Sequence, residues 1–147
     1  MDKDKIPTGT TSVHPNLRLF TSVIPLAVTL RETSPVFDEC FILPEMSEAQ
    51  IDTRNLPVRE CAHVFNEESR VNLLAASTEP TFQFYTGDGV NVPSSGEAKG
   101  FGSRAGLCLE AGRPINAVND PNTRKWVVLK KGEVYGSYTS YTVWTST

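Results

Sequence analysis

Alternation of apolar and polar side chains with a period of two is the feature that most constrains the fold of this chain. From Glu60 onward, Cys61, His63 and Phe65 alternate with Ala62 and Val64, and residues 134–144 alternate in the same way near the end of the sequence. Successive side chains of a strand point to opposite faces, so this pattern predicts half-buried β-strands rather than helices.

The remaining segments give similar signals. We expect further strands at residues 37–43, 71–77, 81–86, 105–111 and 126–130, with a hairpin turn at 67–70 and a long loop at 87–102. Prolines at positions 7, 15, 25 and 35 exclude a long helix from the first 35 residues, because each removes a backbone donor. One short strand or helical turn is expected at 24–30 and one helical turn at 47–51. Together these elements predict an antiparallel all-β sandwich or barrel.

Composition narrows the function classes. The 147 residues carry 14 basic and 17 acidic side chains, a net charge of −3, which argues against nucleic acid or an anionic membrane as the main partner. The apolar stretches are too short to span a bilayer, and the polar start does not resemble a secretory signal. Three cysteines without close spacing suggest a reduced, cytoplasmic compartment. We therefore expect one domain over residues 1–147.

Several motifs are discounted on context. Residues 100–105 match a dinucleotide-binding glycine pattern, but they lack the preceding strand and following helix that this motif requires. His14 and His63 have no partner at metal-ligand spacing, and His63 on an alternating strand is interpreted as a satisfied strand residue. Cys108, flanked by leucines, is interpreted as a small buried apolar residue. The residues themselves indicate no metal and no cofactor.

Glu110 is the strongest candidate for acid–base chemistry. Alternation places Leu107 and Leu109 on one face of the expected strand and Glu110 on the other, near the end of the strand, where a pocket wall could tune a general base. The alternative is a structural ion pair between Glu110 and Arg104, Arg113 or a cation of a neighbouring strand.

Two polar residues on other expected strands share this ambiguity. Asp38 follows Phe37 and has the same two interpretations as Glu110. Gln83, between Phe82 and Phe84, is either an edge-strand polar residue or a ligand for a sugar hydroxyl. Aromatic surface beside amide and carboxylate groups suits a polyhydroxylated ligand.

Five blocks span nearly the whole chain: Ile-Pro-Thr-Gly at 6–9, Phe-Asp at 37–38 before Phe-Ile-Leu at 41–43, EPTFQFYTG at 79–87, GLCLE at 106–110 after Ser-Arg at 103–104, and Pro114 to Pro121 followed by Gly-Glu-Val-Tyr at 132–135 with Tyr141. In this order they resemble the aldose 1-epimerase (galactose mutarotase) family.

The resemblance implies a galactose mutarotase-like antiparallel β-sandwich and an isomerase that interconverts the α and β anomers of hexoses such as galactose and glucose. In that family a glutamate takes the proton of the C1 hydroxyl while a histidine protonates the ring oxygen. Glu110 falls on the family's general base, Asp38 on an aspartate that binds sugar hydroxyls, and Gln83 on a glutamine of the same pocket. No cofactor is implied, because proton transfer suffices.

The resemblance covers only the C-terminal part of the family's domain. The general-acid histidine, a second pocket histidine and a sugar-binding arginine lie in the other part, and neither His14 nor His63 matches their motifs. We therefore expect an incomplete sandwich, a need for a complementary N-terminal half, and no activity of the isolated chain. The alternatives are a non-catalytic carbohydrate-binding β-sandwich and an inactive fragment with unpaired strands that is prone to aggregate.

Overall fold

The protein is described here from a computed structural model, which describes residues 8, 10–15, 36–43 and 50–147. These residues form six strands: β1 (Asp38–Ile42), β2 (Arg59–Phe65), β3 (Val71–Ser77), β4 (Thr81–Tyr85), β5 (Cys108–Gly112) and β6 (Thr139–Thr145). Two single-turn 3₁₀ helices, η2 (Ala117–Asn119) and η3 (Arg124–Trp126), lie between β5 and β6. No α-helix occurs in the described ranges, and nothing helical there is long and apolar enough to cross a membrane. The all-β prediction is confirmed.

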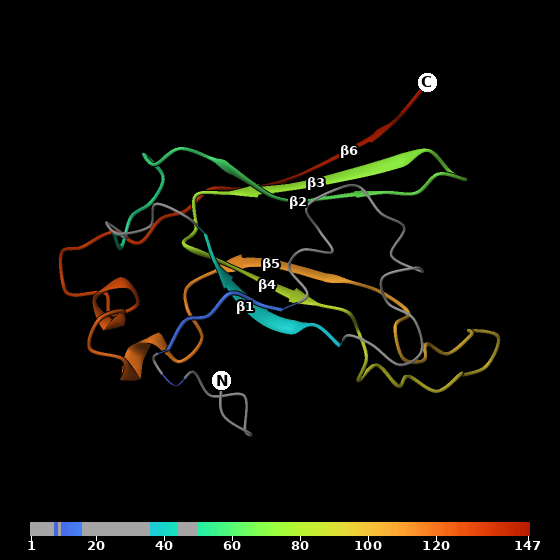
Figure 1. Cartoon of the computed structure of the whole chain (residues 1–147), viewed down its shortest axis with the longest axis horizontal. Coiled ribbons are helices and arrows are strands. Elements are labelled where there is room, and N and C mark those ends of the chain that lie inside the picture. The colour runs from blue at the N-terminus through green and yellow to red at the C-terminus, as the bar shows by residue number, and fades with distance from the viewer. Residues whose placement is uncertain (1–7, 9, 16–35, 44–49) are drawn as a thin grey trace. The chain divides into compact units, whose positions relative to one another are not determined.

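The chain separates into two compact units. The smaller one comprises Tyr85–Cys108 together with the described residues up to Asp38, and the larger one comprises the described residues of 39–84 together with Leu109–Thr147. The larger unit holds nearly all of every strand. Within it the two sheets form separate layers, as expected of a sandwich (Figure 1).

The first sheet of the larger unit has the order β2-β3-β6 and is antiparallel throughout. The predicted hairpin joins β2 to β3 through a turn in which Arg70 has a positive φ of 56° and Asn66 N donates to the carbonyl of Val71 at 2.9 Å. Ala75 of the central strand is 1% exposed. The sequence therefore predicted both strands of this hairpin and the turn between them, whereas the shift in their register between Glu60 and Ala62 was not predicted.

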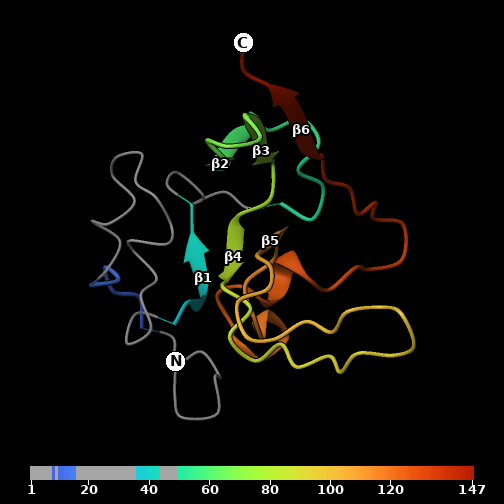
Figure 2. The ribbon, with the colours of Figure 1, turned by 90° about the vertical axis from the view of Figure 1, so that its right-hand side faces the viewer.

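The second sheet has the order β1-β4-β5 (Figures 1 and 2). Its strand β4 follows β3 after only three residues, Thr78, Glu79 and Pro80. Phe82 in β4 is 4% exposed. A hydrogen bond of 2.7 Å from the Tyr141 hydroxyl on β6 to the carbonyl of Leu109 on β5 links the two layers.

Polar side chains make up much of the buried interior near the chain's crossing from β3 to β4. Ser77, Thr78, Glu79 and Thr81 are all buried, at 0–3% exposure. Thr78 shares a hydrogen bond of 3.0 Å with the hydroxyl of Thr53, which is also buried. Buried polar groups of this kind destabilise a fold unless they are hydrogen-bonded, so the stability of the segment between β3 and β4 depends on these hydrogen bonds.

Two predicted strands differ from the structure. The segment predicted as a strand at 126–130 instead begins in η3, because the N–H groups of Arg124 and Trp126 bond to carbonyls only three or four residues earlier, those of Asp120 and Thr123. The strand predicted at 134–144 begins only at Thr139; before it the chain makes one isolated bridge, between Gly136 and Asp52. The segments 17–34 and 24–30, and most of 47–51, lie outside the described residues.

Candidate functional site

Gln83 and Glu110 lie at the centres of neighbouring strands in the larger unit. The arrows of β4 and β5 run in opposite directions in Figure 1. At one end of the pair, the Thr81 hydroxyl donates to the carbonyl of Gly112 at 2.7 Å. Taking Thr81 and Gly112 as opposite residues, we infer from the strand bounds that Gln83 lies opposite Glu110. Residues opposite one another in an antiparallel pair present their side chains on the same face.

The apolar residues of both strands support the same alignment. It places Phe82 opposite Ala111 and Phe84 opposite Leu109, so that apolar side chains meet on the other face. Leu109 and Ala111 are half-buried, whereas Glu110 is exposed. The predicted alternation of this strand is therefore confirmed.

Cys108 corrects one interpretation. It was expected to be a small buried residue between two leucines, but the structure shows it exposed and unpaired with any other cysteine. The physical reason is the alternation itself, because Cys108 shares a face with Glu110 rather than with Leu107 and Leu109.

The proposed ion-pair alternative for Glu110 is not what the structure shows. Arg104 pairs with Asp88 at 2.7 Å, and Arg113 pairs with Glu79 at 2.9 Å. Among the residues described, the Glu110 side chain has no ion pair and no hydrogen bond. Its carboxylate is therefore open to solvent and to a ligand.

Asp38, the third candidate, is half-buried at the start of β1 and belongs to the smaller unit, whereas Gln83 and Glu110 belong to the larger one. The residue before it is fixed in place, because Phe37 N donates to the Thr86 hydroxyl at 3.1 Å and Thr86 N donates to the carbonyl of Phe37 at 2.9 Å. The Thr86 hydroxyl also donates to Asp88. That bond, followed by the pairing with Arg104, lowers the pKa of Asp88.

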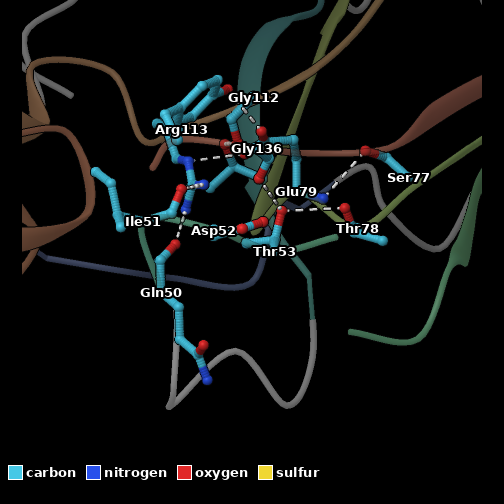
Figure 3. Close-up of polar contacts among 12 residues, drawn as sticks. Gln50, Ile51, Asp52, Thr53, Ser77, Thr78, Glu79, Gly112, Arg113 and Gly136 are labelled. Carbon is cyan, nitrogen blue, oxygen red and sulfur yellow. Dashed lines mark hydrogen bonds and ion pairs between the residues drawn. The ribbon is translucent and has the colours of Figure 1, made fainter. Parts of the chain in front are cut away.

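The sequence did not predict a buried charged cluster next to this candidate site, centred on Glu79 and Arg113 (Figure 3). Arg113 Nη1 donates to the carbonyl of Gln50 at 2.8 Å and Nη2 to that of Ile51 at 3.2 Å. The Tyr135 hydroxyl donates to Glu79 Oε1 at 2.9 Å, and the Arg113 guanidinium lies 5.5 Å from the Tyr135 ring centre. The placement of Glu79 directly before Pro80, between two expected strands, was the available signal.

The histidines have structural contacts. His63 Nε2 lies 3.0 Å from Asn72 Oδ1, and its ring stacks on Trp144 with centres 5.4 Å apart. The ring of His14 lies 4.9 Å from that of Phe37. In the parts of the chain that the structure describes, His, Cys, Asp and Glu side chains form no group of three or more that would hold a metal ion.

The family of this chain is shown by its similarity to known proteins. A profile of the aldose 1-epimerase family matches residues 1–142, so the chain belongs to the aldose 1-epimerase family.

Its relatives include a bifunctional protein GAL10 of Kluyveromyces lactis, 42% identical over 144 residues, which covers 93% of this chain and 18% of that protein. An uncharacterized isomerase of Saccharomyces cerevisiae is 34% identical over 139 residues, covering 92% of this chain and 37% of the relative. A galactose mutarotase of Sus scrofa is 33% identical over 109 residues, covering 74% of this chain and 28% of the relative. The chain therefore spans less than two-fifths of each of these relatives.

Proposed function

We propose that residues 1–147 are the base-bearing C-terminal portion of an aldose 1-epimerase that interconverts the α and β anomers of hexoses such as galactose and glucose. The observation that carries the proposal is Glu110 itself: it is exposed, unpaired among the described residues, and on the strand next to that of Gln83. The family membership and the galactose mutarotase relative support a sugar substrate. A cytoplasmic location is part of the proposal, supported by three free cysteines; nucleic acid and membranes are not proposed as partners.

In this proposal Glu110 accepts the proton of the C1 hydroxyl. An acid donates a proton to the ring oxygen, the bond between C1 and that oxygen breaks, and C1 becomes an aldehyde. Rotation about the C1–C2 bond exposes either face of the aldehyde, and the reverse proton transfers close the ring. Gln83 and Asp38 bind sugar hydroxyls. Ring opening and ring closing need only acid–base catalysis by proton transfer, so the proposal includes neither metal nor cofactor.

The acid is proposed to come from a complementary N-terminal half. His63 is engaged with Asn72 and Trp144, and His14 packs against Phe37, so neither histidine is offered for this role. The edge strand β6 supports a covering partner. Its side chains Tyr141, Val143 and Trp144 are 54%, 63% and 40% exposed, which is unusual for apolar residues of a strand.

Polarimetry on freshly dissolved α-D-galactose or α-D-glucose tests the proposal. A general base without its acid loses a factor of about 10²–10⁴ in rate, so the 147-residue chain alone should show no mutarotation above the buffer rate. A rate for the isolated chain that the variant Glu110→Gln abolishes would overturn the need for a second half.

A non-catalytic carbohydrate-binding β-sandwich is the second candidate function. A chain that neither catalyses nor binds a sugar would be an inactive fragment. The binding candidate is favoured by the exposed carboxylate of Glu110 on the strand next to the half-buried Gln83, while both histidines have structural contacts. Titration of the ¹⁵N-labelled chain with galactose distinguishes the two. Shifts of the Gln83 and Glu110 amides support binding, and their absence in a folded chain rejects it.

A further inference from the structure

We infer that the buried pair Glu79–Arg113 is a positioning device that holds Gln83 and Glu110 opposite one another. The inference rests on the proposed function, since it gives these two strands their role. Neither Glu79 nor Arg113 is placed in contact with the sugar. They act through the strands they join.

The pair lies directly beside the two strands that carry the candidate site. Glu79 precedes β4 by two residues, and Arg113 is the first residue after β5. Their side chains are 3% and 10% exposed, and Arg113 Nε lies 2.9 Å from Glu79 Oε2. The hydrogen bond from Thr81 to the carbonyl of Gly112 comes next along the strands. The ion pair and this hydrogen bond therefore connect the start of β4 to the end of β5 at two adjacent points.

Both partners of the ion pair are held by other segments, which makes the pair rigid. The Arg113 guanidinium donates to the carbonyls of Gln50 and Ile51, and the Glu79 carboxylate accepts a hydrogen bond from the Tyr135 hydroxyl. The backbone N–H of Glu79 donates to the Ser77 hydroxyl at 3.0 Å. Figure 3 shows the bonds from the Arg113 guanidinium to Gln50 and Ile51 and the bond from the Glu79 N–H to Ser77.

Rigidity at this point matters because the strand register decides which residues meet. A slip of one residue between paired strands moves every side chain of one strand to the opposite face. Such a slip would turn Glu110 away from Gln83 and present Leu109 or Ala111 in its place. Gln83 lies only two residues beyond Thr81, about 7 Å along the strand. The contacts at the start of β4 therefore fix which residue of β5 lies opposite Gln83.

The test compares two variants with a matched control in hexose titrations followed by amide chemical shifts. Glu79→Gln keeps the shape of the side chain and removes the ion pair. Thr81→Val removes the neighbouring hydrogen bond at smaller cost, and serves if the first variant does not fold. Asn72→Ala is the control: Asn72 is 5% exposed and bonded to His63 and Ser146 in the other sheet, so its loss lowers stability away from β4 and β5.

We expect Glu79→Gln to bind galactose roughly tenfold more weakly, the effect of losing about one hydrogen bond to a charged group. Thr81→Val should weaken galactose binding to a lesser degree. The backbone contact between Gln83 and Glu110 in nuclear Overhauser spectra should weaken in parallel, while Asn72→Ala should lower the melting temperature with both signals unchanged. Equal effects of all three variants, or an unchanged contact and affinity in Glu79→Gln, would overturn the inference. If the parent chain binds no hexose, the carbohydrate-binding candidate is rejected, and the contact measurement alone decides the positioning role.

Discussion

Removing Arg113 should be among the most destabilising single changes in this protein. Arg113→Met keeps much of the side-chain volume but deletes the ion pair with Glu79 and the two bonds to the carbonyls of Gln50 and Ile51. The carboxylate of Glu79, 3% exposed, would then be a buried charge with only the Tyr135 hydroxyl as a side-chain partner. Breaking a buried pair in this way costs about 3–5 kcal/mol.

Urea unfolding of four proteins measures this cost: the parent chain, Arg113→Met, Glu79→Gln and the double variant. The double variant should be more stable than Arg113→Met alone, because it leaves no uncompensated buried charge. In thermal unfolding, the single change Arg113→Met should lower the midpoint by an amount on the order of 10 °C. A loss of less than about 1 kcal/mol for Arg113→Met, the size found for an exposed pair, would refute the reasoning.

Three further outcomes follow from local geometry. The side-chain hydrogen bond from Arg54 lowers the pKa of Asp52 to about 2. The ionised pair therefore contributes to stability above the ordinary carboxyl pKa of 3.8, and this contribution is lost as the pH falls toward 2. In an NMR titration, Arg54→Gln should return the pKa of Asp52 toward 3.8, and an unchanged pKa would contradict this. Gly87→Ala should destabilise the fold by about 1–3 kcal/mol in urea unfolding, because φ is +71° and a Cβ would lie 2.5 Å from a backbone carbonyl oxygen; equal stability would contradict this. Burial raises the thiol pKa of Cys61, so a thiol reagent at neutral pH should modify the exposed Cys108 first, as mass spectrometry of the labelled peptides can check.

Local patterns predicted the strands well where alternation was strict. The strand β2 and the face on which Glu110 lies both follow from a period of two, whereas β3 has no such alternation. The apolar run that begins at Trp126 has no such period, and the prediction there was wrong: a short apolar run cannot distinguish a strand from a helical turn, and local backbone bonds from Arg124 decided the outcome.

The choice of ion-pair partners could not be read from the sequence. Arg104 and Arg113 flank Glu110 along the chain, and each was a reasonable partner for it. The fold pairs them instead with Asp88 and Glu79, residues 16 and 34 positions earlier (104 − 88 and 113 − 79). Such pairings depend on how strands are arranged in space, which a single sequence does not contain. The same rearrangement leaves Glu110 unpaired among the described residues and so strengthens its candidacy.

The central claim is that Glu110 is the proton acceptor of an aldose 1-epimerase whose other half lies outside this chain. The most direct measurement is polarimetry on α-D-galactose with the chain joined to the complementary N-terminal part of a family member, compared with the same protein carrying Glu110→Gln. We predict that the joined protein accelerates mutarotation and that Glu110→Gln lowers this rate by a factor of about 10²–10⁴. An active joined protein whose rate survives Glu110→Gln would contradict the claim.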